Sequence, residues 1–363
     1  PLPVQFVHSM ADAMRLVAGA ARAGACVVWI RNTVNACIQA ARELQTQGVD
    51  VEVFHSRFAQ GDRQQREQEV VWWSGVESTD EMRRGKVLLA TQVVEQSLDL
   101  DFDFMISDLA PIDLLLQRAG RLWRHKWRGE RPSGARYALH VVAPSEHDAE
   151  TEHWPSRDLL DWTSAVYHVN ILWRTLRELR AQPVLRVPED VRQVIRKVYD
   201  VNTDDIPDVL QKATLKAIGE MQSQRAIAHN NLHQVDAGYA PGKAWDSDTR
   251  MPTRLGEPQH VVRIARTVSG KLVPWYASES EESWRWWSLS ETKIAMRHLQ
   301  GTPEVPTRHR RAVDDVRQTW RAFEQSIPVL VLEQESGQWR GSFETEKGVV
   351  TFTYDANFGL QKK

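Results

Sequence analysis

The chain has 363 residues, which is enough for two or three domains and a sizeable core. Its 46 basic and 48 acidic side chains give a net charge of −2, so the protein is no global polycation and any nucleic-acid surface must be a local patch. Two cysteines in apolar contexts, no long apolar run and no signal-peptide pattern together predict a cytoplasmic protein with free buried thiols and no membrane span.

Strand-like and helical segments alternate over the first 150 residues. Residues 25–30 form a short apolar run, residues 34–44 have helical spacing, and residues 49–55 alternate apolar with polar side chains. Further strand-like runs lie at residues 87–90, 104–106 and 137–142. This order predicts an α/β fold with a parallel sheet and right-handed crossovers. Within it, a helix over the first 20 residues is expected to pack on the sheet, and Asp62 with Gln65 predicts a capping box.

The remaining residues predict a helical linker and then a small α+β domain. Helical patterns cover residues 158–180, 188–199 and 206–228. Short β-branched or aromatic runs then lie at residues 261–266, 272–275, 328–332, 339–343 and 349–354. We expect these runs to form an antiparallel sheet with a helix over residues 312–324 against it. The predicted domains are therefore residues 1–150, 151–235 and 236–363.

The most informative stretch is residues 86–128, KVLLATQVVEQSLDLDFDFMISDLAPIDLLLQRAGRLWRHKWR. Arg118, Arg121 and Arg124 are three residues apart, a spacing that would place three guanidinium groups along one face of a helix. Ligands of an open α/β sheet bind at the carboxyl ends of its strands, so the segments after Ala90 and Ile106 are expected to line one cleft. Arginines there could stabilise a transferring phosphoryl group.

The wording ATQVVEQSLD followed by QRAGRLWR resembles motifs V and VI of superfamily 2 helicases, and looks most like the helicase–nuclease of type I CRISPR systems. The resemblance covers about the first 140 residues strongly and the remainder weakly. It implies a RecA-like sheet domain, ATP and Mg²⁺ as cofactors, and translocation along single-stranded DNA. It also implies recruitment by an RNA-guided surveillance complex in prokaryotic antiviral defence, with the subtype leaning towards I-E.

Five residues match nucleotide positions of these motifs. By resemblance, Arg121 and Arg124 are the catalytic arginines that reach the terminal phosphate. Gln117 and Arg118 match the leading pair of the same motif, assigned to ATP binding, although that pair more often couples the two halves of the motor than touches the phosphate. Asp99 matches the acid that accepts a hydrogen bond from the ribose, although it could be an ordinary turn acid beside two other aspartates. Those three acids lack the glycine and closing glutamate of an EF-hand loop, so we predict no metal there.

Three short groups match the DNA-contacting motifs, and each follows a predicted strand. They are Asn32 and Thr33; His55, Ser56 and Arg57; and Thr91, Gln92 and Val93. Hydroxyls and backbone amides at strand ends contact phosphates without reading bases, which suits a motor that walks any sequence. The basic residues between 121 and 136 could extend this path or form a solvated loop.

Two parts of a complete motor are missing from the sequence. No Gly-rich loop ends in Gly-Lys-Ser or Gly-Lys-Thr, since Gly242-Lys243 is followed by Ala244, and no Asp-Glu magnesium pair is found. The family's HD nuclease, with its metal, lies ahead of the motor. We therefore expect the carboxyl half of a motor, a cut product that begins Pro1-Leu2-Pro3 and is inactive alone. Its partners would be the N-terminal HD nuclease and the first RecA-like domain.

Two other functions stay open. The chain could belong to a different superfamily 2 motor, such as an RNA helicase or a restriction translocase, or it could be a non-catalytic split subunit or interaction module. The sequence also has 15 tryptophans, of which Trp284, Trp286 and Trp287 are clustered. Because acidic residues flank that cluster, we expect a core edge or protein contact rather than a base-stacking platform. Trp72, Trp73 and Trp123 are expected to be packing residues.

Overall fold

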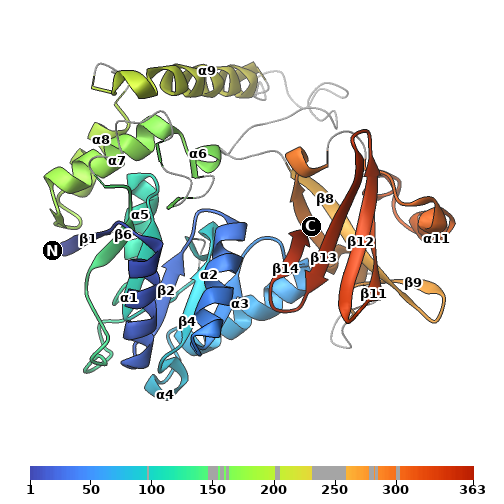
Figure 1. Ribbon diagram of the computed structural model, residues 1–363, viewed down its shortest axis with the longest axis horizontal. Coiled ribbons are helices and arrows are strands. Elements are labelled where there is room, and N and C mark those ends of the chain that lie inside the picture. The colour runs from blue at the N-terminus through green and yellow to red at the C-terminus, as the bar shows by residue number, and fades with distance from the viewer. Residues whose placement is uncertain are drawn as a thin grey trace, which may run out of the picture. The chain divides into compact units, whose positions relative to one another are not determined.

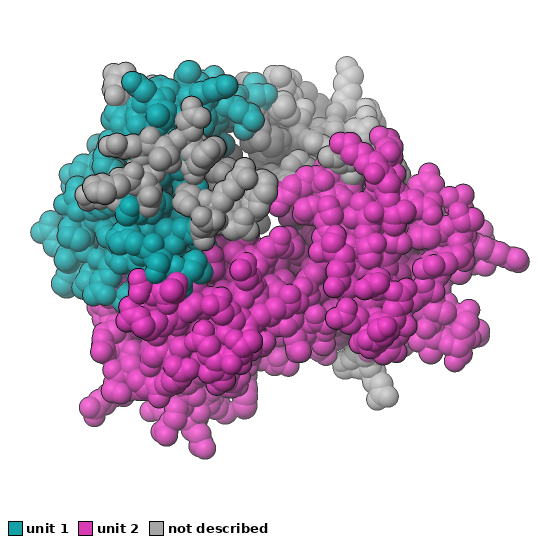
Figure 2. Space-filling view, viewed as in Figure 1, with its two compact units in different colours: residues 1–10, 108–116, 140–256 teal, residues 11–107, 117–139, 257–363 magenta. Residues whose placement is uncertain are grey.

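The computed structural model describes residues 1–95, 98–145, 154–155, 159–160, 163–200, 205–230, 259–277, 282, 285–299 and 303–363. The chain divides into two compact units, shown in Figure 2. Unit 1 comprises residues 1–10, 108–116 and 140–256, and unit 2 comprises residues 11–107, 117–139 and 257–363. This division does not test the three expected domains, whose boundaries stay predictions. None of the described helices combines the length and apolar character needed to cross a bilayer.

Unit 2 contains the parallel sheet that the sequence predicts. Its strands, in the order β3-β4-β2-β5, are β2 (Val27–Ile30), β3 (Val51–Phe54), β4 (Val87–Ala90) and β5 (Phe104–Asp108). All three neighbouring pairs are parallel. Every residue of β2, β4 and β5 is buried, as expected where helices cover both faces of a parallel sheet.

The helices around this sheet were predicted only in part from the apolar periodicity of the sequence, which is clear at residues 10–22 and 34–46. They are α1 (Met10–Arg22), α2 (Val34–Thr46), α3 (Gln60–Ser74) and α4 (Asp80–Arg83), followed after β4 by the 3₁₀ helix η1 (Gln92–Glu95) (Figure 1). The capping box predicted at Asp62 is wrong, because α3 begins one turn earlier, after Ala59, and its N-terminus has no side-chain cap. Asp62 instead accepts hydrogen bonds from Trp275 and Tyr354.

Unit 1 contains a second group of strands and the helices of the predicted linker. Its strands, in the order β6-β1-β7, are β1 (Leu2–Val7), β6 (Leu139–Val142) and β7 (Val184–Leu185), with β1 and β7 antiparallel. Its helices are α6 (Thr163–Val166), α7 (Val169–Ala181), α8 (Val191–Val198) and α9 (Asp208–Asn230). The helix α5 (Ile112–Ala119) begins in this unit. The strand β1 was not predicted, and the helix expected over the first 20 residues begins only at Met10.

The C-terminal part of unit 2 is a second sheet, in the order β10-β8-β11-β12-β13-β14, with β9 paired to β8. Its strands are β8 (Gln259–Val268), β9 (Lys271–Pro274), β10 (Glu291–Ala295), β11 (Val329–Glu335), β12 (Gln338–Thr345), β13 (Gly348–Asp355) and β14 (Gly359–Lys362). The shorter elements are α10 (Trp286–Leu289), η5 (Met296–His298), α11 (Thr307–Arg317) and η6 (Ala322–Glu324). The expectation of an antiparallel sheet is wrong for one pair, since β8 and β11 are parallel. Parallel neighbours require a long crossover, and α11 lies within it.

Side chains of β11 alternate between two apolar layers, so both faces of this sheet are covered. Leu330 and Leu332 pack with Phe352 and Tyr354 on one face, and Val329 and Val331 pack with the α11 side on the other. Among the tryptophans, Trp287 packs on Trp320 with ring centroids 5.0 Å apart, which fits a core edge, while Trp284 lies outside the described residues. Trp73 is buried as expected, but the packing role predicted for Trp72 is wrong because it is 64% exposed.

Candidate functional site

The three groups predicted to contact DNA meet at one edge of the parallel sheet. Ile30 and Phe54 both pair with Ala90 in register, so β2, β3 and β4 end at the same level. The segments that follow them therefore lie side by side. Two backbone hydrogen bonds confirm this arrangement, from Arg31 N to Ala90 O at 2.8 Å and from Thr91 N to Phe54 O at 3.2 Å.

Several of these residues also have structural partners. The Thr33 hydroxyl caps α2 by accepting a hydrogen bond from Ala36 N at 3.2 Å. The carbonyl of Asn32 accepts one from Gln92 Nε2 at 3.2 Å, which joins the first and third groups. Thr91 is buried, whereas Gln92 and Val93 are half-buried. The structure thus brings the three groups together, and their contact with DNA stays a prediction.

The loop at residues 55–59 is built around a buried imidazole. The His55 ring stacks on Phe58 with centroids 4.5 Å apart, and its Nδ1 accepts a hydrogen bond from Arg57 N at 3.2 Å. Burial, followed by the positive charges of Arg57 and Arg66, lowers the pKa of His55 from 6.5 to about 3, so the ring is neutral. His55 supports the loop from within, while Ser56 and Arg57 carry its partly exposed polar groups.

Arg118 links the segments that follow β2 and β4 to a side chain of β5. Its guanidinium is fully buried and donates to Glu95 Oε1 at 2.7 Å and to Ser107 Oγ at 2.7 Å, with Asn32 Oδ1 at 3.5 Å. Glu95, after Ala90, and Ser107, after Ile106, therefore lie close together, while the cleft expected between these segments stays a prediction. Because its Nε and Nη1 already have protein acceptors, Arg118 acts here as a tie between motifs. Its neighbour Gln117 is exposed, and the assignment of both to the nucleotide stays a prediction.

Arg121 and Arg124 do not continue this helix, so the predicted stack of three guanidinium groups along one helical face is wrong. The helix α5 ends at Ala119, and Gly120 follows it. The chain then runs beside Phe102, whose N–H donates to Arg121 O at 2.9 Å and whose carbonyl accepts from Trp123 N at 3.0 Å. Because Phe102 precedes β5, both arginines lie towards the amino-terminal end of that strand. The expected place for them, at the carboxyl ends of the strands, is therefore also wrong.

Near the amino-terminal end of β5, Asp99 and Arg124 form an accessible ion pair. Arg124 Nε lies 2.5 Å from Asp99 Oδ1, and the two side chains are 42% and 52% exposed. His125 Nε2 contacts the same oxygen at 3.2 Å. The hydrogen bond from Arg124 lowers the pKa of Asp99, and the contact with His125 acts in the same direction. For Arg121, burial and the nearby charge of Arg124 lower the pKa. The Arg121 guanidinium is thus close enough to the exposed Asp99–Arg124 pair to feel the charge of both side chains.

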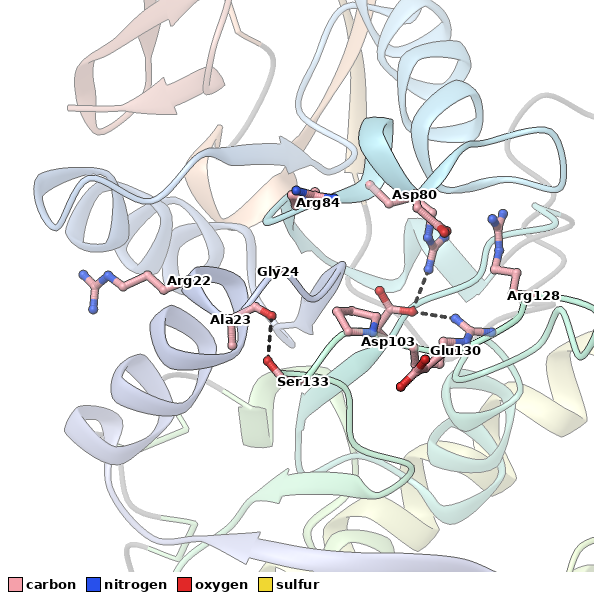
Figure 3. Close-up of a pocket in the computed structure, with 12 residues that line it drawn as sticks. Arg22, Ala23, Gly24, Asp80, Arg84, Asp103, Arg128, Glu130 and Ser133 are labelled. Carbon is pink, nitrogen blue, oxygen red and sulfur yellow. Dashed lines mark hydrogen bonds and ion pairs between the residues drawn. The ribbon is translucent and has the colours of Figure 1, made fainter.

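A buried ionic cluster adjoins this pair, and the sequence did not reveal it. The Asp101 carboxylate lies 2.9 Å from both Arg128 Nε and Arg131 Nη1, and Asp103 lies 3.0 Å from Arg83 Nη2. Arg83 also lies 3.4 Å from Asp101. Figure 3 shows Asp103 in the wall of an adjoining cavity of ≈ 680 Å³, with Arg84, Arg128 and Glu130 nearby. Arginines 128 and 131 are thus interior ion-pair partners of the aspartates.

The other cations of the 121–136 segment point outwards. Arg124, Lys126 and Arg136 are exposed, so the strand-path and solvated-loop interpretations both stay open for them. The spacing of Asp101 and Asp103 could have suggested that Arg128 and Arg131 point inwards. Two acids two residues apart at the start of a buried strand need positive charges to compensate them. Within the part of the chain that the structure describes, no group of three or more His, Cys, Asp or Glu side chains could hold a metal ion. Both cysteines are free and buried, as predicted.

Comparison with known proteins identifies the relatives of this chain. Residues 23–127 match the family model described as CRISPR-associated nuclease/helicase Cas3, C-terminal. The Escherichia coli K12 CRISPR-associated endonuclease/helicase Cas3 is 34% identical over 217 residues, covering 57% of this chain and 23% of that protein. The Thermus thermophilus protein of the same name is 36% identical over 241 residues, with 60% and 25% covered. The chain thus spans about a quarter of the length of these relatives.

The fold agrees with the same family over nearly the whole chain. A solved structure of T. fusca Cas3 with ATP superposes with a TM-score of 0.72 at 26% identity, covering 99% of this chain and 42% of that one. The covered part includes both sheets of unit 2 and the helices of unit 1. In sequence over residues 23–127 and in fold over nearly its whole length, the chain is thus similar to the C-terminal part of CRISPR-associated nuclease/helicases of the Cas3 type.

Proposed function

We propose that this chain supplies the second half of an ATP-dependent motor that translocates along single-stranded DNA in type I CRISPR interference. The observation that carries the proposal is the separation of two sets of motif residues on one sheet. The three groups predicted to contact DNA, residues 32–33, 55–57 and 91–93, which we call the strand-end groups, lie at the carboxyl edge of the sheet. Asp99, Arg121 and Arg124 lie near the amino end of β5. A motor half needs such a division, because it must hold a strand and sense a nucleotide at the same time.

The second set suits the ribose and phosphates of a nucleotide. The exposed Asp99 carboxylate can accept hydrogen bonds from ribose hydroxyls, and guanidinium groups bind phosphate oxygens with two donors each. Since Asp99 and Arg124 pair with each other here, a nucleotide would replace that contact on both sides. An arginine finger that the second half of the motor supplies to the nucleotide makes hydrolysis depend on closure of the cleft between the two halves. ATP appears in the name of the related T. fusca structure.

The phosphate loop and the magnesium ligands would come from the first RecA-like domain, and the nuclease metal from an N-terminal HD domain. These partners, the RNA-guided surveillance complex and the prokaryotic cytoplasm as the site of action belong to the same proposal. The chain alone should then hydrolyse no ATP. Hydrolysis by a motor that combines it with a phosphate-loop segment would be the activity to test.

The strand-end groups suit a single strand of any sequence. Ser56, Arg57 and Gln92 have partly exposed polar side chains, and the N-terminus of α2 presents its backbone amides nearby. Contacts of this kind go to phosphates and carry no base information. We therefore expect stimulation by single-stranded DNA irrespective of sequence. Stimulation by RNA alone would instead favour another superfamily 2 motor.

The test compares Arg121→Ala and Arg124→Ala with Arg15→Ala in a motor reconstituted with the phosphate-loop segment. Arg15 is also an exposed arginine paired with an aspartate, at 2.6 Å, but it lies on α1 away from the motifs. Loss of a phosphate-sensing arginine should lower DNA-stimulated hydrolysis by about 10³-fold, whereas Arg15→Ala should leave it unchanged. Full activity of all three variants would leave the chain as a non-catalytic interaction module.

A further inference from the structure

The loop at residues 55–59 is held by the C-terminal end of the chain. Ala59 N donates a hydrogen bond of 2.9 Å to the hydroxyl of Tyr354, 295 residues later in the sequence. Leu360 N, in β14, donates another of 2.9 Å to Arg57 O. The β13–β14 hairpin, residues 348–362, therefore fixes two backbone positions of the loop that carries Ser56 and Arg57. Figure 1 shows β14 beside α3, the helix that follows this loop.

A half-buried carboxylate, that of Asp62, completes the attachment. Tyr354 OH donates to Asp62 Oδ2 at 2.5 Å, and Trp275 Nε1 donates to the same oxygen at 2.9 Å. Tyr354 is buried, and both burial and the charge of Asp62 raise its pKa well above the usual 10.0, so the hydroxyl keeps its proton. It can therefore accept from Ala59 and donate to Asp62 at once. In this way the first turn of α3 is hydrogen-bonded to the second sheet at two places, Tyr354 in β13 and Trp275 directly after β9.

The two surfaces approach so closely that glycine is required on both. A methyl group built at Gly61 would lie 2.3 Å from the Tyr276 ring, far inside van der Waals contact. One built at Gly359, where φ is +60°, would lie 2.8 Å from Arg57 O. Further along, Arg42 donates to Gln361 at 2.8 Å and covers the Phe358 ring at 4.8 Å. The interface with the C-terminal sheet thus extends from α2 to α3, along the edge of the first sheet that carries the residues predicted to contact DNA.

We propose that the β13–β14 hairpin is a positioning element for the strand-contacting loop, with Tyr354 as its central positioning residue. The inference rests on the proposed function, since it concerns the strand path of that motor. Tyr354 has no accessible atoms to offer a strand. It acts by holding the backbone of residues 57–59 in one conformation, so that less chain entropy is lost when single-stranded DNA binds. The C-terminal sheet therefore contributes to DNA affinity without touching the strand.

The first test is Tyr354→Phe, which keeps the ring and its packing on Trp275 but removes the hydroxyl. Binding of a fluorescein-labelled oligo-dT to the purified chain should weaken about tenfold. In the reconstituted motor, the DNA concentration for half-maximal hydrolysis should rise by the same factor, with the rate at saturating DNA unchanged. The matched control is Tyr199→Phe, which removes another tyrosine hydroxyl that donates to an aspartate, at 2.6 Å from Asp113. It should leave oligo-dT binding unchanged.

The second test separates the two surfaces with a methyl group. Gly61→Ala should weaken oligo-dT binding at least as much as Tyr354→Phe, because the new Cβ displaces Tyr276. Adding Tyr276→Ala makes room and should restore most of the affinity. Gly19→Ala is the control, since Gly19 also lies within a helix and nothing lies within 4 Å of its added methyl group. Circular dichroism of each variant is the control for folding, and only folded variants are compared.

The outcomes distinguish this inference from the proposed function. If the wild-type chain binds no oligo-dT, the strand path fails and the positioning role fails with it before any variant is compared. If the wild type binds and both folded variants bind equally well, the proposed function stands and the positioning role is wrong. A fall in the rate at saturating DNA, with unchanged DNA affinity, also overturns it, because that pattern reports lost active protein.

Discussion

Two acid–arginine groups begin only two residues apart in the sequence and have opposite surroundings. Asp99 pairs with Arg124 at 2.5 Å, and about half of each side chain is exposed. Asp101 pairs with Arg128 and Arg131 at 2.9 Å each, and its side chain has no exposed surface. His125 contacts both groups, through its ring to Asp99 and through its backbone N–H to Asp101 at 3.2 Å. The ion-pair distances are alike, so the difference lies in burial.

Burial decides which of the two can take part in binding. An exposed ion pair contributes about 0–1 kcal/mol, because water and salt screen it and holding two side chains costs entropy. Asp99 and Arg124 can therefore exchange each other for a ligand at little cost. Breaking a buried pair leaves an uncompensated charge in the interior and costs about 3–5 kcal/mol. The Asp101 group is therefore a fixed structural anchor, by which we mean a buried ion-pair cluster that stays intact. The Asp99 group, which His125 connects to it, is a contact that a ligand can replace.

The largest expected effect comes from breaking the anchor. Asp101→Asn keeps the shape of the side chain but removes the charge that faces Arg83, Arg128 and Arg131. We expect the free energy of unfolding to fall by about 3–5 kcal/mol, because three guanidinium groups would share the one remaining carboxylate, Asp103. Urea denaturation followed by tryptophan fluorescence would measure it.

The control for that experiment is Asp12→Asn. Asp12 also pairs with an arginine, Arg15, at 2.6 Å, but the two side chains are 50% and 74% exposed. Its removal should change the free energy of unfolding by less than about 0.5 kcal/mol. Equal effects of the two substitutions would show that burial does not separate the two kinds of pair.

The repeating elements of the first sheet could be predicted from the sequence, for a physical reason. Strands β2 and β4 are covered on both faces, so they appear as uninterrupted apolar runs, and α2 has one apolar face. The strand β1 and the short strand β14 gave no such signal. The parallel pairing of β8 with β11 depends on contacts 66 residues apart, from Arg263 to Val329, which no local pattern encodes.

The positions of the candidate site residues could be predicted from the sequence only in part. The three strand-end groups gather as expected because parallel strands in register must end together. The helical stack of arginines failed because α5 ends at Ala119 and a bridge to Phe102 redirects the chain. Asp62 shows the same limit of local reasoning. Its spacing to Gln65 suits a helix cap, yet tertiary contacts with Tyr354 and Trp275 take its carboxylate.

A smaller effect is expected from removing the replaceable carboxylate. Asp99→Asn should weaken ATP binding by the reconstituted motor about tenfold, because one charge-assisted hydrogen bond to the ribose is lost. A 2′,3′-dideoxy analogue of ATP lacks those hydroxyls, so its affinity should be the same for both proteins. Isothermal titration with the two nucleotides measures the difference. Equal losses for ATP and the analogue would mean that Asp99 acts on the phosphate arginines and not on the ribose.

The smallest effect is the pH dependence of stability at Asp99. Its pKa is lowered from 3.8 in the folded protein, first by the hydrogen bond from Arg124. On acidification the unfolded chain therefore takes up this proton before the folded one does. The stabilisation by Asp99 is complete above the unfolded pKa of about 3.9 and is lost as the pH falls through the lower folded value. Because the side chain is half exposed, solvent screening limits it to a few tenths of a kcal/mol.

Subtracting the stability of Asp99→Asn from that of the wild type, between about pH 6 and about pH 2.5, isolates this contribution. The difference should be small and positive at the upper end and should fall towards the lower end. Salt at about 1 M should also remove it, since the Debye length falls to about 3 Å. The loss caused by Asp101→Asn should survive the same salt, because ions do not reach a buried carboxylate. If salt abolished both differences, the Asp101 group would be accessible to solvent, and the distinction between an anchor and a replaceable contact would fail.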